Sequence, residues 1–376
     1  MNTAMMLRRT PFHDRAAEAN RDNAWLPRGG FTLAAHYTSI AEEALAARLR
    51  VAMADISWRW RVALEGGRAG EMLSHLVTRD ATKLAPGEAL KALWLTDGAG
   101  VRGAGVVVRC ASDAFLLASA APDAAWFERA AVRFGVDVRE KCGAGLAVIG
   151  PYAAYVLRQA ELDAILDPLR FRKVRWNGLD VTLSRWGEHG GYEIWCEGDD
   201  APLVWDRIAR AGEAFGILPA GVGAMDVLDI EAGVLRPERD YDPARSAADT
   251  APSPQSLGLE RLIDEQHTDF TGRRGLLAAR QAEQTTIVGL EIESDQPASH
   301  TPLIVGGRTV GHAVASCYSP ALRRAIAIAR METTASEAGT MLMLTLAPTR
   351  RHREFREVGA RVARLPFLPA PDPLPA

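Results

Sequence analysis

The pattern of apolar and polar positions divides the first 160 residues into helices and short strands. Residues 41–50 follow Thr38 and Ser39 and carry Glu42 and Glu43 in their first turn, which predicts a helix. Strict alternation and short apolar runs between turn signals predict strands. The expected strands are 51–57, 60–65, 89–96, 105–110, 114–119 and 145–151, and the expected helices are 41–50, 69–76, 122–134 and 152–159. This irregular order indicates an α+β fold.

A hairpin and a glycine-rich turn dominate the middle of the chain. Asn177-Gly178 joins two short strands within residues 172–186, and a polar turn at 187–191 leads into the alternating segment 192–197. Alternation places Tyr192 on one face of that strand and Glu193 on the other, beside Trp195. A carboxylate beside aromatic rings suits a flat heterocycle with hydrogen-bond donors, although a hairpin with a solvated glutamate would give the same pattern.

The last ninety residues change to short β segments with regular turns. They lie at 286–293, 303–305, 308–315, 325–331, 341–346 and 353–364, which predicts a small closed barrel. We therefore expect a first region over residues 1–283, built of two α+β lobes, and a barrel domain over 284–376. Three further parts of the first region complete the picture. Residues 1–30 are polar and irregular, and residues 236–256 are expected to form a long loop. Between them we expect a helix at 201–215 and the end of another helix at 226–232.

Composition narrows the classes of function. A net charge of -3 and a hydrophobic share of 48% describe an ordinary soluble protein without the basic surface of a nucleic-acid binder. The four cysteines are scattered and the histidines lie far apart, so we expect neither disulfides nor a metal site. No apolar run is long enough to span a membrane, and no leader is evident, so we expect a cytoplasmic protein.

Most familiar catalytic signatures are missing. The chain has no phosphate-binding loop, no Gly-x-Ser-x-Gly and no His-Glu-x-x-His. The segment 221–226 (GVGAMD) resembles half of a dinucleotide fingerprint, but it lacks the third glycine and a preceding strand, so we interpret it as a turn.

Several short motifs, in order, resemble the glycine cleavage T-protein (aminomethyltransferase) superfamily. In the first region they are MADIS at 53–57 after the helix at 41–50, LVTRDATKLAPG at 76–87, IGP at 149–151, GYEI at 191–194 and IEAG at 230–233. In the barrel region they are VG at 310–311, SCYSP at 316–320, GT at 339–340 and PF at 366–367. The resemblance spans roughly residues 8–370 and implies a three-lobed ring, two α+β lobes and a C-terminal β-barrel, with tetrahydrofolate in the central opening.

The resemblance also implies positions for the folate. Glu193 matches the family glutamate that holds the pterin, whose ring N–H and amino group a carboxylate can accept together. Tyr192 adjoins Glu193, and Val107 would form the apolar wall of the site.

This chain departs from the family pattern at four places. Gly103 and Ala104 stand where T-proteins carry two aspartates, the first of which assists methylene transfer. Met225 and Asp229 replace two arginines, and Lys91 replaces a tyrosine. The expected catalytic residues are therefore open, with Arg102, Lys91, Tyr241 and Asp226 as candidates for orienting a substrate or stabilising a leaving anion.

Three functions fit this pattern. The first is a tetrahydrofolate-dependent demethylase that moves a methyl group from a small methylated substrate to N5, since direct transfer needs mainly positioning. Two motifs resemble the dimethylsulfoniopropionate demethylase branch, namely RRTPF at 8–12 and GGYEIW at 190–195, where the turn is one residue longer than in T-proteins. Two others resemble sarcosine oxidase-type enzymes, namely SPQSLG at 253–258 and DFTGR at 269–273. The alternatives are glycine-cleavage aminomethyl transfer and a folate-binding protein without catalysis. The oligomeric state stays open.

Overall fold

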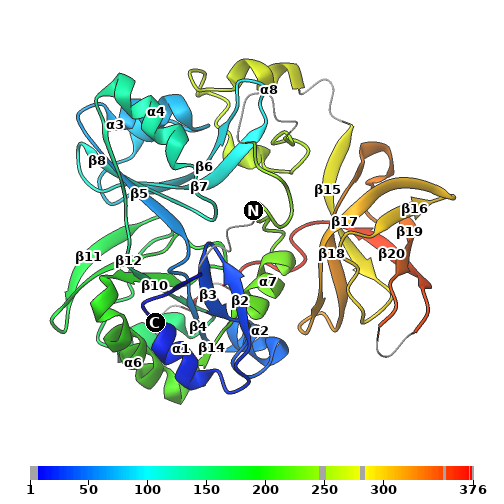
Figure 1. Ribbon diagram of the computed structural model, residues 1–376, viewed down its shortest axis with the longest axis horizontal. Helices are drawn as coiled ribbons and strands as arrows, with labels where there is room; N and C mark the ends of the chain where they lie inside the picture. The colour runs from blue at the N-terminus through cyan, green and yellow to red at the C-terminus, as the bar shows by residue number, and fades with distance from the viewer. Residues whose placement is uncertain (1–6, 245–250, 280–283, 350–352, 372, 375–376) are drawn as a thin grey trace, which may run out of the picture.

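Three groups of β-strands divide the computed structural model into two mixed lobes and a barrel (Figure 1). The structure describes residues 7–244, 251–279, 284–349, 353–371 and 373–374. The α+β architecture with a C-terminal barrel confirms the fold class that the sequence predicts. No helix within these residues is both long and apolar enough to cross a membrane.

The first lobe is a six-stranded sheet with the order β11-β12-β13-β10-β4-β14. Its strands are β4 (Ala52–Asp55), β10 (Ala144–Ile149), β11 (Phe171–Trp176), β12 (Leu179–Ser184), β13 (Tyr192–Cys196) and β14 (Leu218–Pro219). Its helices are α2 (Ile40–Leu49), α5 (Ala153–Gln159), α6 (Ala201–Gly212) and α7 (Val222–Glu231). Leu146, Val148, Leu183 and Ile194 are fully buried in its core, which explains why the central strands read as apolar.

The second lobe interrupts the first, because its strands lie between β4 and β10 in the chain. Its sheet has the order β6-β7-β8-β5-β9. The strands are β5 (Trp60–Glu65), β6 (Ala89–Leu95), β7 (Val101–Arg109), β8 (Ala114–Ser119) and β9 (Asp137–Glu140), and the helices are α3 (Ala69–Leu76), α4 (Ala124–Phe134) and, from later in the chain, α8 (Arg273–Ala279). The two lobes are thus joined where the chain crosses from β4 to β5.

The N-terminal segment is ordered, in contrast to the irregular start expected from its polar composition. It forms a three-stranded sheet of β1 (Arg8–Arg9), β2 (Trp25–Arg28) and β3 (Phe31–Ala34), with α1 (His13–Ala19) between β1 and β2. Phe12 is fully buried in the core of the first lobe. Phe12, with Ala16 and Ala34, docks this segment without an apolar run, and periodicity does not detect it.

The segment 221–226 opens a helix instead of forming the expected turn. α7 begins at Val222 directly after Gly221, whose amide donates to the Glu43 carboxylate at 2.8 Å. A β-carbon at Gly221 would lie 2.5 Å from the carbonyl oxygen of Ala35. Glycine is therefore required here by close packing of two backbone segments, and not by a nucleotide phosphate.

The barrel closes with the strand order β15-β18-β17-β16-β19-β20, as predicted. Its strands are β15 (Thr285–Ile292), β16 (Pro302–Val305), β17 (Arg308–Ser319), β18 (Arg324–Glu332), β19 (Met341–Leu346) and β20 (Arg356–Ala363). The expected boundary at 283/284 adjoins residues 280–283, which lie outside the described part of the chain. After β20 the tail returns to the first lobe, where the Leu368 amide donates to the Glu231 carbonyl at 3.0 Å and the Leu374 amide to the Pro151 carbonyl at 2.9 Å.

Candidate functional site

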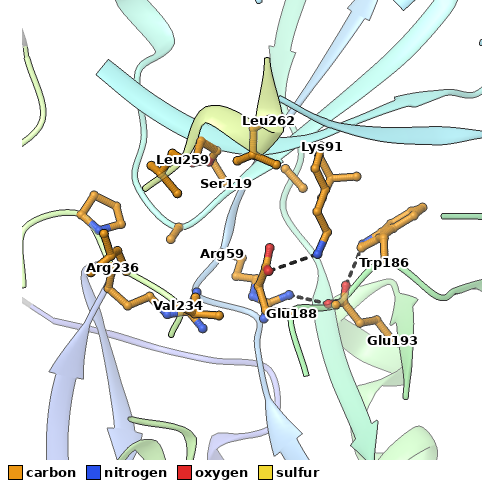
Figure 2. Close-up of a pocket in the computed structure, with 18 of the residues that line it drawn as sticks. Arg59, Lys91, Ser119, Trp186, Glu188, Glu193, Val234, Arg236, Leu259 and Leu262 are labelled. Carbon is orange, nitrogen blue, oxygen red and sulfur yellow. Dashed lines mark hydrogen bonds and ion pairs between the residues drawn. The ribbon is translucent and has the colours of Figure 1, made fainter. Parts of the chain in front are cut away.

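A cavity of about 170 Å³ lies between the two mixed lobes (Figure 2). The second lobe supplies β6, β7 and the end of β8, the first lobe supplies β13 and the turn before it, and the segments after α7 close the remaining side. Its polar lining residues are Arg59, Lys91, Ser119, Glu188, Glu193, Arg236, Tyr241 and Arg261. Charged groups from distant parts of the chain therefore converge on one cavity.

Glu193 is the most deeply held acid of this cavity. Its side chain is 2% exposed, and Arg59, which is 12% exposed, pairs with its Oε1. The indole N–H groups of Trp186 and Trp195 donate to its Oε2 at 2.9 Å and 3.1 Å. A buried carboxylate is stable when it is paired and hydrogen-bonded, so these three donors explain how an ionised glutamate is accommodated here.

The strand pattern explains the orientation of Glu193. In β13, Tyr192 faces the core of the first lobe, where its hydroxyl donates to the Ala164 carbonyl at 2.9 Å, while Glu193 and Trp195 face the other way. Gly145 on β10 pairs with Trp195, and a β-carbon there would lie 2.4 Å from the indole ring. The absent side chain at Gly145 thus lets the Trp195 ring lie against β10 with its N–H directed at Glu193.

The two indoles also separate the cavity from an outer surface groove. Trp186 and Trp195 line the cavity on one side and an open groove of about 590 Å³ on the other. The Arg61 guanidinium stacks on the Trp195 ring from the groove side, 3.7 Å from its centre. The wall behind Glu193 is therefore a single layer of aromatic rings.

Lys91 and Glu188 form a second charged pair inside the cavity. The Lys91 Nζ lies 3.1 Å from Glu188 Oε2, with the two side chains 26% and 34% exposed. Burial opposes ionisation of the Glu188 carboxyl, but the charge and hydrogen bond of Lys91, with the charges of Arg236 and His189, outweigh it and hold its pKa below the ordinary value. Glu188 is therefore ionised at neutral pH.

A buried ion cluster borders the cavity through Arg236. Asp229 on α7 accepts from Arg236 Nε at 2.5 Å and Nη2 at 2.6 Å, and His189 Nε2 lies 2.8 Å from its Oδ1. Burial of Asp229 is outweighed by the charge of Arg236 and the contact with His189, and the pKa of the Asp229 carboxyl is strongly lowered. Arg236, from the segment after α7, thus supplies the positive charge that pairs with Asp229.

An aromatic ring fills the space beside Gly103, the position at which the resemblance implied a missing aspartate. A β-carbon at Gly103 would lie 2.3 Å from Cζ2 of Trp94, its partner on β6. Trp94 is almost fully buried, and its indole N–H donates to Asp123 at 3.0 Å. Gly103 therefore reflects tight packing of a large ring against β7, and no side chain of any kind fits at this position without rearrangement.

Three of the seven residues singled out from the sequence line the cavity together, namely Glu193, Lys91 and Tyr241. The other four lie elsewhere. Arg102 makes a buried two-point ion pair with Asp123, Asp226 pairs with Arg28 and Arg239 outside the cavity, Tyr192 lies in the core of the first lobe, and Val107 lies in the core of the second.

The correction for Val107 has a simple cause. Val106, Val107 and Val108 are all buried, so the run carries no alternation from which a face could be assigned. Val106 is the valine that lines the cavity, while Val107 points to the opposite side of β7.

Sequence reasoning missed Arg59, Trp186, Glu188 and Arg236. Arg59 and Trp186 sit in connections that leave β4 and β12, and Glu188 sits in the glycine-rich turn before β13. The turn's unusual composition was the available signal for Glu188, whereas nothing in the local pattern around Arg59 points to Glu193, 134 positions away. Within the described residues, no group of three or more His, Cys, Asp or Glu side chains is placed to hold a metal ion.

The fold and the cavity together define a three-lobed α+β protein whose site lies between its two mixed lobes. The family profile of the GCVT N-terminal domain matches residues 12–263, and that of the glycine cleavage T-protein C-terminal barrel domain matches residues 286–368. The chain therefore belongs to the glycine cleavage T-protein family, as the resemblance predicted. Members are aminomethyltransferase-type transferases that depend in general on tetrahydrofolate.

Individual relatives agree with this assignment. The chain is 30% identical over 375 residues to the aminomethyltransferase of Bacillus subtilis, covering 96% of this chain and 99% of the relative. It is 27% identical to the trimethylamine-oxide aldolase of Ruegeria pomeroyi, covering 89% of this chain and 44% of that protein. The crystal structure of the glycine cleavage system aminomethyltransferase T from Bartonella henselae shares the fold, with a TM-score of 0.87, 23% identity, and coverage of 98% and 100%.

Proposed function

We propose that this protein is a tetrahydrofolate-dependent methyltransferase that takes a methyl group from a small methylated substrate. The observation that carries the proposal is Glu193, an ionised carboxylate held by three fixed donors at the wall of the cavity between the lobes. The carboxylate would anchor the pterin through its adjacent N–H groups. Tetrahydrofolate, when bound, supplies N5 as the methyl acceptor.

The residues present are compatible with a pterin. A carboxylate has about four acceptor positions, and the chain's own donors occupy three of those of Glu193. Oε1 receives a single donor, Arg59, so a ligand N–H can share this oxygen or replace the guanidinium. Val106 and Ala104 would supply the apolar wall first assigned to Val107.

Methyl transfer is favoured over glycine cleavage by the packing at Gly103. The position where T-proteins carry the aspartate for methylene transfer is filled by the Trp94 ring, so the cavity offers no carboxylate there. Chemistry within the family is also varied, since one relative is a trimethylamine-oxide aldolase. Direct transfer of an activated methyl group relies mainly on positioning, which a cavity lined by groups from both lobes can supply.

Titration calorimetry with tetrahydrofolate tests the anchor. Wild type is compared with Glu193→Gln, which keeps the side-chain shape, and with Glu197→Ala, a control on the same strand face whose residue is exposed in the outer groove. We expect affinity to fall at least tenfold for Glu193→Gln and to stay unchanged for Glu197→Ala. Equal affinity of wild type and Glu193→Gln would refute the assignment of Glu193.

A second experiment tests the chemistry. Methylated amines, sulfonium compounds and methoxy-aromatics are incubated with protein and tetrahydrofolate, and 5-methyltetrahydrofolate formation is measured. The alternative of a folate-binding protein without catalysis is motivated by the missing acid at Gly103, and it predicts folate binding with no product from any donor. Methylene transfer from an aminomethyl donor would instead support the glycine-cleavage alternative.

A further inference from the structure

The Lys91–Glu188 pair joins the two lobes across the cavity. Lys91 belongs to β6 of the second lobe, and Glu188 belongs to the turn between β12 and β13 of the first. Their charged atoms lie 3.1 Å apart, and both side chains line the cavity that Glu193 faces (Figure 2). An acid and a base from separate lobes thus meet at the proposed binding site.

The turn that carries Glu188 is fixed in place by its glycines. Gly190 and Gly191 have φ values of +68° and +67°, which other residues rarely adopt, and a β-carbon at Gly191 would lie 2.3 Å from the Val148 carbonyl oxygen. A β-carbon at Gly187 would lie 3.1 Å from Glu193 Oε1. The turn is therefore pressed against both β10 and the Glu193 carboxylate, and Glu188 projects from a defined position.

The remaining acids near the cavity are already committed to other contacts. Among the described lining residues the carboxylates are Glu188 and Glu193, and Glu193 accepts from three donors. Asp229 lies fully buried behind the wall and is held by Arg236. Glu188, a third exposed and contacted by one lysine, is the carboxylate that can exchange a proton with a ligand.

We propose that Glu188 and Lys91 are the proton-transfer pair of this site, an inference that rests on the proposed methyl transfer. When a methyl group moves from an atom X of the donor to the amine of the acceptor, the C–X bond breaks, a C–N bond forms, and the electron pair of the broken bond stays on X. The acceptor amine must release one proton in every case. With a neutral donor, such as a methoxy-aromatic or a tertiary amine, X is left with a negative charge and must gain one proton, whereas a cationic donor leaves X neutral and needs only the proton acceptor. Glu188 takes the released proton, Lys91 gives a proton to X, and proton return across their contact restores both groups.

Kinetics of Glu188→Gln and Lys91→Met test the pair with the donor that the screen identifies. General acid–base groups contribute about 100-fold or more, so with a neutral donor we expect each variant to lower kcat about 100-fold while tetrahydrofolate affinity changes less than about threefold. With a cationic donor, only Glu188→Gln should lower kcat to this extent. Glu188→Asp, which keeps the carboxylate, should recover part of the rate. Lys83→Met, at an exposed lysine paired with Asp80, is the matched control and should keep wild-type kcat.

A second readout needs no turnover. The chain has four lysines, Lys83, Lys91, Lys141 and Lys173, so the side-chain resonances of isotope-labelled lysine can be assigned by substitution in the unliganded protein. Because the Lys91 Nζ lies 3.1 Å from Glu188 Oε2, Glu188→Gln should shift the side-chain resonance of Lys91 and leave that of Lys173 unchanged.

The outcomes separate this inference from the proposed function. Wild-type turnover with unchanged kcat in folded Glu188→Gln would overturn the proton-transfer pair while leaving methyl transfer intact. An unshifted Lys91 resonance in Glu188→Gln would overturn the contact on which the pair depends. Failure of wild type to bind tetrahydrofolate or to turn over any donor would overturn the proposed function itself, and the pair with it.

Discussion

The two carboxylates of the cavity differ in how the protein holds them. Glu193 is 2% exposed and accepts from an arginine and two indoles, whereas Glu188 is 34% exposed and contacts one lysine. Glu193 is carried by a central strand between β12 and β10, and Glu188 by a turn. The first arrangement fixes a charge in one geometry, and the second leaves a charge able to respond to a ligand.

This difference separates binding from chemistry within one site. A carboxylate held in one geometry by fixed donors is suited to recognise ligand N–H groups, because its own position need not change on binding. A carboxylate with one charged partner and access to the cavity is suited to exchange protons. The following predictions test that division, from the largest effect to the smallest.

Glu193→Ala should be the most destabilising change in the cavity. It leaves the Arg59 guanidinium, 12% exposed, without its acid and two indole N–H groups without an acceptor. We expect a loss of about 3–5 kcal/mol in the free energy of unfolding, measured by urea denaturation. Glu188→Ala is the comparison and should lose less than about 1 kcal/mol, since its pair is partly solvated. Similar losses of unfolding free energy for Glu193→Ala and Glu188→Ala would contradict the difference in how the protein holds the two carboxylates.

Gly103→Asp should fail to restore the family's acid. Its β-carbon would overlap the Trp94 ring at 2.3 Å, so we expect about 3 kcal/mol of destabilisation from overpacking and no gain in aminomethyl transfer. Ala104→Asp is the control, because Ala104 lines the cavity and offers space there. A stable Gly103→Asp protein with glycine-cleavage activity would contradict the packing argument.

Trp186→Phe should weaken the hold on Glu193 by one donor. Hydrogen bonds to charged groups contribute about 1.5–3 kcal/mol, and the expected loss of unfolding free energy is about 1.5 kcal/mol. The matched control is Trp25→Phe, since the Trp25 N–H donates to Asn23 at an exposed site and its loss should cost less than about 0.5 kcal/mol. Equal losses of unfolding free energy in the two variants would contradict a stabilising contribution from the hydrogen bond between Trp186 and Glu193.

The stability contributed by Glu188 should depend on pH in a defined direction. Its folded pKa is lowered by Lys91, so its contribution is complete above the unfolded pKa of about 4.3 and is lost as the pH falls through the folded value. The difference in unfolding free energy between wild type and Glu188→Gln should be about 0.5 kcal/mol at pH 7 and should shrink on acidification below about pH 4. A difference that grows on acidification would contradict the lowered pKa.

Sequence reasoning succeeded where local pattern determines the structure. Alternation along 192–197 fixed which residues share a face with Glu193, and turn signals located the barrel strands close to their observed bounds. It failed where contacts join distant parts of the chain. Arg59 reaches Glu193 from the crossing between lobes, and Lys91 meets Glu188 only because the two lobes face each other.

Other failures came from uninformative composition. The valines of β7 are buried on both faces of their sheet and gave no direction for Val107, while Arg102 looked like a site residue because its buried partner Asp123 lies 21 positions away. The polar segment 8–34 carries too few apolar residues to show periodicity, yet Phe12 anchors it in the core.

The aromatic wall behind Glu193 gives the protein a built-in optical probe. Of nine tryptophans, Trp186 and Trp195 direct their N–H groups at the carboxylate on one side and border the outer groove on the other. A ligand that alters the charge or hydrogen bonding of Glu193 changes the electric field along both indoles and therefore their emission. Ligand binding in the cavity can accordingly be followed by intrinsic fluorescence. The Trp186→Phe and Trp195→Phe variants identify which of the two rings gives the signal.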